Sequence, residues 1–433
     1  MQTPGGMTAL EFGSKWVRPT DWLTMPTVLE SEQKIVMLVA VYDHDSNFCA
    51  FNIAGNYTVD WGDGSALEDI ASGVQAEHVF DYADLAGTES SRGYRQALII
   101  ITPQSGSNIT AAAMSEQHSQ ALTSYYSATL DVVASCEFAT TFVFYGSSSS
   151  TSLERFQFLS SGVTNATNMF RDCTSLQVVP LFDTSSVTYA SNMFRGCTSL
   201  QVVPLFDTSG VTNATSMFYS CYSLQVVPLF DTSSVTDASN MFYSCYSLQV
   251  VPLFDTSSVT YASNMFYRCT SLQVAPLFDT SGVTNASNMF RDCYSLQVVP
   301  LFDTSGVTDA TSMFYSCTSL QVVPLFDTSG VTNATSMFYR CYSLQVVPLF
   351  DTSGVTNATN MFYSCYSLAK AALSGTSIDI DYTGCKLAKT EIDEIFTNLA
   401  TVVGKTITVT GNHGAATCDT SIATAKSWTV ITA

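Results

Sequence analysis

Residues 211–234 read VTNATSMFYSCYSLQVVPLFDTSS, and almost the same 24 residues recur along the middle of the chain. Nine cysteines mark the recurrence, each 24 positions after the last: Cys173, Cys197, Cys221, Cys245, Cys269, Cys293, Cys317, Cys341 and Cys365. A fixed period of this length is typical of solenoids, because each unit is too small to bury its own apolar face and must stack on its neighbours. The period therefore predicts an elongated rod of nine rungs.

Within one unit, the spacing of apolar residues predicts a short helix followed by a short strand. The first half has apolar residues every three or four positions, as one face of a helix does: Val211, Ala214, Met217, Phe218 and Cys221. Residues 223–228 alternate and are partly β-branched, which favours a strand, and Pro228 should end it because proline lacks a backbone N–H. We expect Leu229 and Phe230 to return to the core and residues 231–233 to turn the chain.

The unit resembles the BspA-type leucine-rich repeats of bacterial surface proteins. The likeness is carried by Met217-Phe218, Cys221, Ser223-Leu224, Pro228 and Phe230-Asp231-Thr232-Ser233, and it covers about residues 153–376. It implies a leucine-rich-repeat-like α/β solenoid that is right-handed, with a parallel sheet on one face and short helices. It also implies an adhesive role, since the family serves adhesion in many settings.

Comparison of the nine copies separates scaffold positions from variable ones. The Val, Thr and Ala of the VTxA motif, the Met-Phe pair, the cysteine and the Ser-Leu pair never change. The positions that vary include those eight and two residues before each cysteine, and the one residue after it. These positions carry mainly Tyr, Asn, Asp, Thr and Arg, and a set rich in Tyr and Asn suits adaptable recognition surfaces.

The variable positions therefore predict a candidate binding ridge. It consists of Tyr189, Tyr219, Tyr222, Tyr243, Tyr246, Tyr261, Tyr267, Tyr294, Tyr315, Tyr339, Tyr342, Tyr363 and Tyr366, together with Arg171, Arg195 and Arg291. Two interpretations stay open: the positions are solvated and free to vary, or they form a stacked column that binds a ligand. A column of surface tyrosines is unusual, whereas isolated ones are common.

The cysteine column allows three interpretations: a disulfide framework, a metal site or buried free thiols. Nine is an odd number, and parallel Cβ vectors on stacked rungs would strain an S–S torsion. No histidine accompanies the column as a further metal ligand. We therefore expect small apolar core thiols.

A column of aspartates would place like charges one rung apart, where they repel each other. Its members are Asp183, Asp207, Asp231, Asp255, Asp279, Asp303, Asp327 and Asp351. We expect each carboxylate to cap its own turn by accepting backbone N–H bonds. A row of bound Ca²⁺ ions is the alternative, and no other cofactor or metal is predicted.

The N-terminal part of the chain has a different pattern. Residues 56–65, NYTVDWGDGS, indicate a strand that enters a tight glycine-rich turn, and residues 96–102 indicate another strand. These features resemble the PKD domain, a small β-sandwich of extracellular and surface proteins, although residues 83–94 form an unusual insertion. The matching residues are Asp60, Trp61, Gly62, Asp63, Gly64 and His78. Asp60 and Asp63 are expected to form turns rather than a cation site.

The chain is thus expected to have five regions. They are an N-terminal arm (1–34), a PKD-like β-sandwich (35–110), a junction with the first irregular rungs (111–160), nine repeats (161–376) and a C-terminal cap (377–433) with a helix near residue 390.

Composition excludes several functions. The chain carries 36 acidic and 16 basic residues, a net charge of −20, which argues against binding nucleic acid or anionic membranes. No run of 18 apolar residues predicts a membrane span, and no signal peptide is evident. The four histidines are scattered, and phosphate-loop, HExxH and GxSxG motifs are lacking, so the protein is not expected to be an enzyme.

These observations favour a non-enzymatic surface or attachment protein of a virion, such as a phage fibre or decoration protein. The solenoid would bind a host-surface glycan or protein, and the arm and N-terminal domain would contact other virion proteins. Two alternatives stay open: a purely structural subunit of a particle or filament, and a bacterial cell-surface adhesin. The chain could also form a homo-oligomer.

Overall fold

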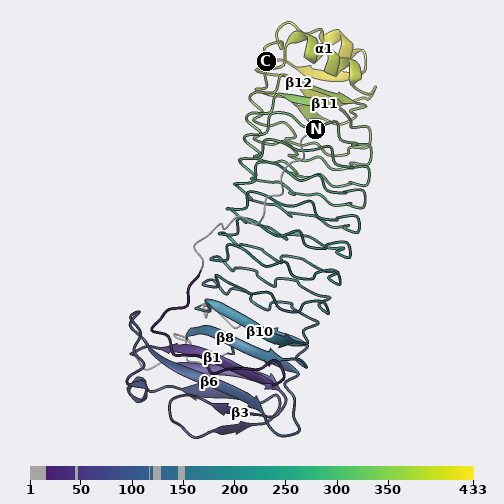
Figure 1. Ribbon diagram of the computed structural model, residues 1–433. Helices are drawn as coiled ribbons and strands as arrows, with labels where there is room; N and C mark the ends of the chain where they lie inside the picture. The colour runs from purple at the N-terminus through teal and green to yellow at the C-terminus, as the bar shows by residue number, and fades with distance from the viewer. Residues whose placement is uncertain (1–15, 44–46, 117, 120–127, 145–151) are drawn as a thin grey trace, which may run out of the picture.

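The molecule is a long rod that stands on a wider base (Figure 1). The computed structural model describes residues 16–43, 47–116, 118–119, 128–144 and 152–433. The base is built from the N-terminal strands, the rod from the repeats, and the C-terminal residues close the far end with a helix. Among the described residues, helices long and apolar enough to cross a membrane are lacking.

Two sheets form the base. One has the strand order β10-β8-β1-β6-β3-β4, and the other β5-β2-β7-β9. The first comprises β10 (Arg155–Ser161), β8 (Ala128–Cys136), β1 (Lys34–Val41), β6 (Arg95–Pro103), β3 (Tyr57–Asp60) and β4 (Glu68–Ile70). The second comprises β5 (Gln75–Val79), β2 (Phe48–Ala54), β7 (Ala111–Ala113) and β9 (Thr141–Val143), and a short 3₁₀ helix spans Tyr82–Leu85.

The two sheets share one apolar core. Phe51 of β2 lies 6.2 Å from Tyr57 of β3 and 5.5 Å from Trp61, ring centre to ring centre, and all three side chains are fully buried. The strands predicted around residues 56–60 and 96–102 are present as β3 and β6. The assignment of this base to the PKD family stays a prediction.

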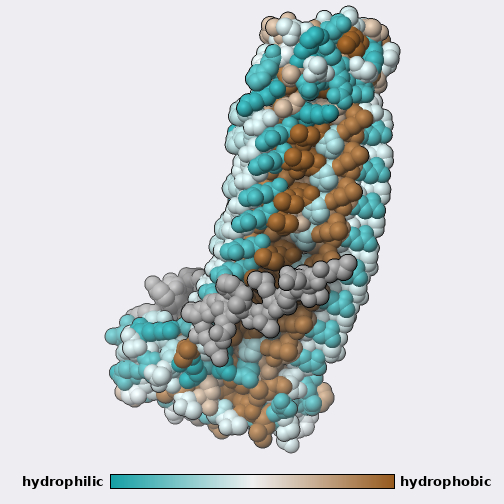
Figure 2. Space-filling model, turned by 45° about the horizontal axis from the view of Figure 1, so that its top comes forward, coloured by the Kyte–Doolittle hydropathy of each residue, from teal (hydrophilic) through white to brown (hydrophobic). Residues whose placement is uncertain are grey.

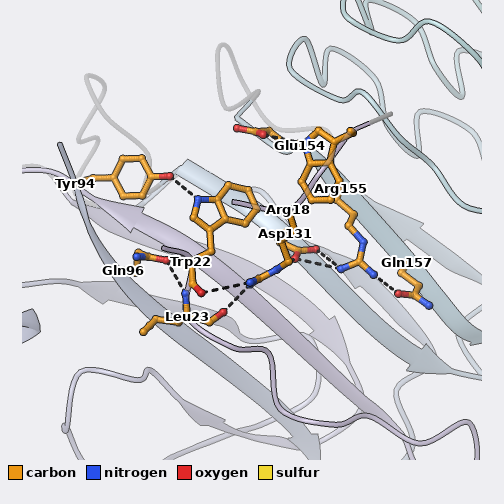
Figure 3. A network of polar contacts seen from close by, with 10 residues as sticks. Arg18, Trp22, Leu23, Tyr94, Gln96, Asp131, Glu154, Arg155 and Gln157 are labelled. Atoms are coloured by element: carbon orange, nitrogen blue, oxygen red, sulfur yellow. Dashed lines mark hydrogen bonds and ion pairs between the residues drawn. The ribbon is translucent and has the colours of Figure 1, made fainter. Parts of the chain in front are cut away.

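The arm from residue 16 to residue 33 packs on the outer face of the first sheet. Trp22 is 4% exposed, and its indole N–H donates to the hydroxyl of Tyr94 at 2.9 Å. Arg18 donates to Asp131 on β8 at 2.9 Å, and Arg155 of β10 approaches the same carboxylate at 3.3 Å (Figure 3). The described part of the arm is therefore fixed to its own chain.

The base continues into the rod without a break in hydrogen bonding. β10 pairs in parallel with β8, and Arg155 at its start forms a parallel bridge to Val178 in the first repeat. On the other sheet, Thr141 of β9 forms a parallel bridge to Asn165. Each base sheet thus serves as the template on which the rungs stack.

The predicted helix in each repeat is wrong, because the first half of each unit consists of turns. Within the predicted helix of residues 211–221, Ser216 and Ser220 both have left-handed backbones, with φ of 57° and 59°. Two left-handed residues four positions apart prevent a continuous α-helix. Met217 N–H bonds back to Ala214 at 3.1 Å, whereas Ser216 N–H bonds forward to Ser239 in the next rung at 2.9 Å.

The second half of the unit pairs in parallel, as predicted, but mostly as single bridges such as Val226 with Val250. A regular strand occurs only in the last full rung, where β11 (Val346–Asp351) pairs with β12 (Lys370–Ser374). Proline two residues after the bridge interrupts the ladder because it has no N–H. Phe230 is buried as predicted, but Leu229 is 59% exposed, so the prediction that it faces the core is wrong.

Stacked columns of identical residues fill the core of the rod. The Phe218 ring lies 5.5 Å from Phe194 and 5.6 Å from Phe242, almost parallel to both. Cys221 is fully buried, and its thiol donates to the carbonyl of Phe194 in the preceding rung at 3.0 Å. All thirteen cysteines are free, which confirms the expectation of core thiols.

The C-terminal residues close the open end of the core. The elements are β13 (Ile380–Asp381), α1 (Lys389–Asn398), β14 (Lys405–Thr408), α2 (Thr420–Thr424) and β15 (Trp428–Ile431). Tyr382 stacks on Phe362, the last ring of the phenylalanine column, at 5.1 Å. The helix predicted near residue 390 is confirmed, and it begins after Ala388 without a side-chain cap.

Candidate functional site: a tyrosine–arginine ridge

Most of the predicted ridge residues form two adjoining columns along one side of the rod. Two residues before each cysteine stand Arg171, Arg195, Tyr219, Tyr243, Tyr267, Arg291, Tyr315, Tyr339 and Tyr363. One residue after the cysteine, the column carries Tyr222, Tyr246, Tyr294, Tyr342 and Tyr366, with Thr in the other rungs. We call these two columns, with the residues between them, the tyrosine–arginine ridge.

Tyrosines of successive rungs stack face to face. The ring centres of Tyr219 and Tyr243 lie 4.4 Å apart with an angle of 6° between the planes, and Tyr243 and Tyr267 repeat this geometry at 4.4 Å. In the second column, Tyr222 and Tyr246 stack at 4.9 Å. The rings therefore cover each other's faces, so the edges and hydroxyl groups are left to contact solvent.

Arginines occupy the gaps in the first column. The guanidinium of Arg195 lies 4.6 Å from the ring centre of Tyr219, at one end of a tyrosine stack. Arg291 lies 4.2 Å from the ring of Tyr315 and 5.6 Å from that of Tyr267, so it bridges two stacks. Cation–π contact of this kind holds the guanidinium in place while part of it stays solvated.

The structure adds Arg268 and Arg340, which the sequence analysis missed. Both stand one residue before a cysteine, and each lies over a ring of the ridge, at 5.4 Å from Tyr267 and 5.3 Å from Tyr339. Their position holds Asp, Gly or Ser in the other seven copies. An Arg-Cys pair in two copies was the signal that could have found them.

These two arginines occupy strained backbone. Arg268 has φ of 59° and Arg340 φ of 58°, in the left-handed region that Gly and Asn tolerate best. Residues with unfavourable backbone conformations persist where the surrounding structure over-determines them, and they concentrate at functional sites. The placement of two long cationic side chains at this position is therefore a feature that the fold does not require.

The ridge is cationic in a protein that is acidic overall. It contains five arginines and two aspartates, Asp172 and Asp292, whereas the whole chain has a net charge of −20. Asp292 lies 3.6 Å from Arg268 and 3.9 Å from Arg291. Burial, with the neighbouring tyrosines, raises the pKa of Tyr243 to about 12, so its hydroxyl stays a neutral hydrogen-bond donor.

Tyr189 and Tyr261 lie in a different column from the ridge. Their position, eight residues before the cysteine, forms parallel bridges along the rod, such as Tyr189 with Asn213 and Asp237 with Tyr261. Both side chains are about half exposed, and three rungs separate them. They are too far apart along the rod to stack on each other as the ridge tyrosines do.

The aspartate column caps turns, as predicted. In each of its eight members one carboxylate oxygen accepts the backbone N–H of the serine two residues on, at 3.0 Å for Asp207 and Ser209. These hydrogen bonds from Ser209 lower the pKa of Asp207. Within the described residues, clusters of three or more His, Cys, Asp or Glu that could hold a metal ion are lacking.

The acidic residues of the glycine-rich turn in the base also serve the turn. Asp60 accepts from the Gly62 N–H and Asp63 from the Ser65 N–H, both at 3.0 Å. The second oxygen of Asp63 contacts His78 at 2.6 Å, and the His78 ring stacks on Trp61 at 4.7 Å. This confirms the expected turn-forming role of Asp60 and Asp63.

Comparison with solved structures gives three distant matches. A plant peptide hormone receptor, RGFR1 in complex with RGF2, is 13% identical and has a TM-score of 0.24, covering 61% of this chain and 44% of that one. The TLR13–ssRNA13 complex is 12% identical with a TM-score of 0.24, covering 65% and 51%. The chain thus spans about half the length of these two proteins.

The third match is the functional domain of InlJ from Listeria monocytogenes, which is described as including a cysteine ladder. It is 12% identical with a TM-score of 0.16, and the match covers 70% of this chain and 74% of that one. Among the curated proteins, none matches the sequence.

A family model matches the repeats in four overlapping segments, residues 140–250, 164–276, 201–299 and 275–375. Together these segments cover residues 140–375, which is more than half of the chain. The chain belongs to the family described as "Mycoplasma protein of unknown function, DUF285".

Proposed function

We propose that this protein is a non-enzymatic attachment protein whose ridge binds an extended anionic chain on a host surface, such as an acidic glycan. The observation that carries the proposal is the position of Arg268 and Arg340. Each has a left-handed backbone where seven copies have Asp, Gly or Ser, and each points its cation over a ridge tyrosine. The other copies have the same left-handed backbone without arginine, so the fold does not require a cation at this position.

The geometry of the rings decides the class of ligand. Sugars that bind by stacking need the open face of an aromatic ring, but the faces of Tyr219, Tyr243 and Tyr267 cover one another. What the ridge offers is a row of phenol hydroxyls and guanidinium N–H groups, all of them hydrogen-bond donors. Carboxylate and sulfate groups are strong acceptors for such donors, particularly for arginine.

The repetition favours a polymer over a small molecule. Every rung places a Tyr or Arg two residues before its cysteine, so donors recur about every 4.8 Å along the rod as in any parallel sheet. A chain with regularly spaced anionic groups can contact several rungs together, so that weak single contacts add up through multivalency. A compact ligand would use one or two rungs and would find almost equal sites along the rod.

In this proposal the protein is displayed on the surface of a virus particle, and its base and arm contact other virion proteins. The sequence supports this through the resemblance of the base to PKD domains and of the repeats to BspA-type surface proteins. Display on a bacterial cell surface is the alternative, and it leaves the role of the ridge and its test unchanged.

The test compares binding of a carboxylated and a neutral polysaccharide, polygalacturonate and dextran, by isothermal titration calorimetry. The variant carries Arg268→Ser and Arg340→Ser, since serine is the residue that other copies have at this position. The control carries Lys370→Ser and Lys386→Ser, which removes two exposed cations, one from β12 and one from the C-terminal cap.

The wild type and the control should bind polygalacturonate at least tenfold more tightly than dextran. The arginine variant should lose at least tenfold in affinity for polygalacturonate. Equal affinity of the arginine variant and the wild type would show that the ridge is not the site. An equal loss in the lysine control would show that the binding depends on net charge alone.

A further inference from the structure

A second surface of the rod is apolar and exposed. Eight leucines, one per rung, are 50–62% exposed: Leu181, Leu205, Leu229, Leu253, Leu277, Leu301, Leu325 and Leu349. Beside them runs a column of valines that are 40–61% exposed: Val202, Val226, Val250, Val274, Val298 and Val322. Figure 2 shows the two columns as brown bands along the rod, and we call them the apolar stripe.

The fold does not require these leucines, since their side chains lie outside the core that the phenylalanines fill. Soluble monomers rarely expose a continuous apolar patch larger than roughly 300–600 Å². With rungs about 4.8 Å apart, the eight leucines extend about 34 Å along the rod, and the six valines run beside them for most of that length. A specific interface buries about 800 Å² on each partner.

We propose that the apolar stripe is an interface through which a second copy of this chain associates. The proposal does not depend on the function of the tyrosine–arginine ridge. Three observations support it: the spacing of the side chains, the part of the same face that is already covered, and the charges beside the stripe.

The spacing selects the partner. Leucines on the stripe recur once per rung, about every 4.8 Å, whereas side chains on one face of an extended peptide recur about every 6.6 Å. A peptide that ran along the rod would therefore lose register within a few residues. A second copy has the same repeat, so all of its leucines and valines can interdigitate with those of the first at once.

At the base, the same sheet face is already covered by the chain itself. Val28 of the arm is 8% exposed and packs against Val36 of β1 and Val133 of β8, with Leu159 of β10 beside them. The stripe begins where this cover ends, at a cleft lined by residues that include Glu30, Leu159, Leu181 and Leu205. Apolar residues on this face are thus covered where the chain reaches them, and the stripe is the uncovered remainder.

The charges beside the stripe predict how association depends on salt. The aspartate column runs along the leucine side, and hydrogen bonds from Ser209 and Ser257 lower the pKa values of Asp207 and Asp255. These carboxylates are therefore charged at neutral pH, and the whole chain carries −20. Salt screens the repulsion between two such copies, so association should strengthen with ionic strength.

The test measures the mass of the full chain by sedimentation velocity and light scattering between about 1 and 100 µM. The disrupting variant carries Leu205→Asp, Leu229→Asp and Leu253→Asp on the stripe. The matched control adds the same three charges on another face with Asn213→Asp, Asn285→Asp and Asn333→Asp. Aspartate already occupies that column in two copies, as Asp237 and Asp309.

The wild type and the asparagine control should show a species of twice the 46.8 kDa chain mass, favoured by salt. The leucine variant should stay monomeric, with the melting temperature that the wild type has at monomeric concentrations. A wild type that is monomeric at every concentration, or a leucine variant that still dimerises, would overturn the proposal. Dimers that form only after residues 1–15 are removed would overturn it too, since that segment would then be the natural cover.

Discussion

The guanidinium of Arg18 donates a 2.9 Å hydrogen bond to the carboxylate of Asp131, which lies 113 positions later in the chain. The Asp131 side chain is completely buried. Arg155 approaches the same carboxylate from β10, the base strand on which the first repeat stacks. One buried anion thus joins the arm, the base sheet and the start of the solenoid. Burying a charge is costly unless it is paired, so the network makes the three parts depend on one another.

Asp131→Asn should therefore destabilise the base by about 1–3 kcal/mol, because two arginines lose a charged partner that the amide cannot replace. The arm should also become easier to cleave by chymotrypsin after Trp22. Chemical denaturation and limited proteolysis measure the two effects. Glu89→Gln is the control, since Glu89 is half exposed and its pair with Arg95 should contribute less than about 1 kcal/mol. Equal effects of the two substitutions would contradict the role assigned to Asp131.

The left-handed turns predict that glycine substitutions at these positions do not lower stability, unlike glycine substitutions in a helix. Asn240 has φ of 58°, so Asn240→Gly should leave stability unchanged or raise it, whereas Asn240→Val should cost about 1–2 kcal/mol. In a helix, which the apolar spacing first indicated, glycine would instead cost about 1 kcal/mol relative to alanine. Urea denaturation of the two variants distinguishes the conformations, and destabilisation by glycine would contradict the turn.

The burial pattern predicts a large loss of stability for one apolar residue of a rung and almost none for another. Phe266→Ala removes a fully buried ring from the middle of the phenylalanine column and should cost about 3–5 kcal/mol. Leu277→Ala removes a side chain that is 56% exposed and should change stability by less than about 0.5 kcal/mol at monomeric concentrations. Thermal unfolding of both variants checks this. A large effect at Leu277 would mean that its surface is covered in the monomer.

How far the sequence predicts this fold can be seen at individual positions. The period of 24 and the identity of Phe230 and Cys221 as core residues follow directly from repetition and apolar spacing. The helix prediction failed because an apolar spacing of three and four is shared by a helix and by a series of tight turns. Only the backbone angles at Ser216 and Ser220 distinguish them, and serine has no strong preference that would reveal those angles. The prediction for Leu229 failed for another reason: Leu229 precedes the buried Phe230 in an extended segment, where successive side chains point to opposite sides.

The sequence also predicted the ridge in part. Variable positions such as Tyr219 and Tyr222 could be found by comparing copies, because variation against a constant scaffold marks the surface. The position of Arg268 and Arg340 also varies, but it carries small or acidic residues in most copies, so the Arg-Cys pair in two copies was the only signal there. Their relation to the tyrosines depends on the path of the left-handed turn, which the sequence pattern did not indicate.

The buried cysteine column predicts both low reactivity and a limit of stability at high pH. Burial raises the pKa of Cys341 to about 12 and that of Cys221 well above its ordinary value of 9. A thiol whose pKa is raised in the folded state stabilises the protein below the pKa of the unfolded state. This stability is lost as the pH rises above about 9, because the unfolded chain then releases protons that the folded chain retains. The free energy of unfolding from urea titrations should fall steadily between pH 9 and pH 11.

Reaction with Ellman's reagent at pH 8 tests the same column directly. Twelve of the thirteen thiols are buried and Cys418 is half-buried, so the native protein should react at one site at most, and the protein in guanidinium chloride at thirteen. A Cys418→Ser variant should be nearly silent until it unfolds, which separates reaction of the cap from opening of the rod. Rapid reaction of several thiols in the native variant would show that the rungs open locally, and the column would then not be the closed core described above.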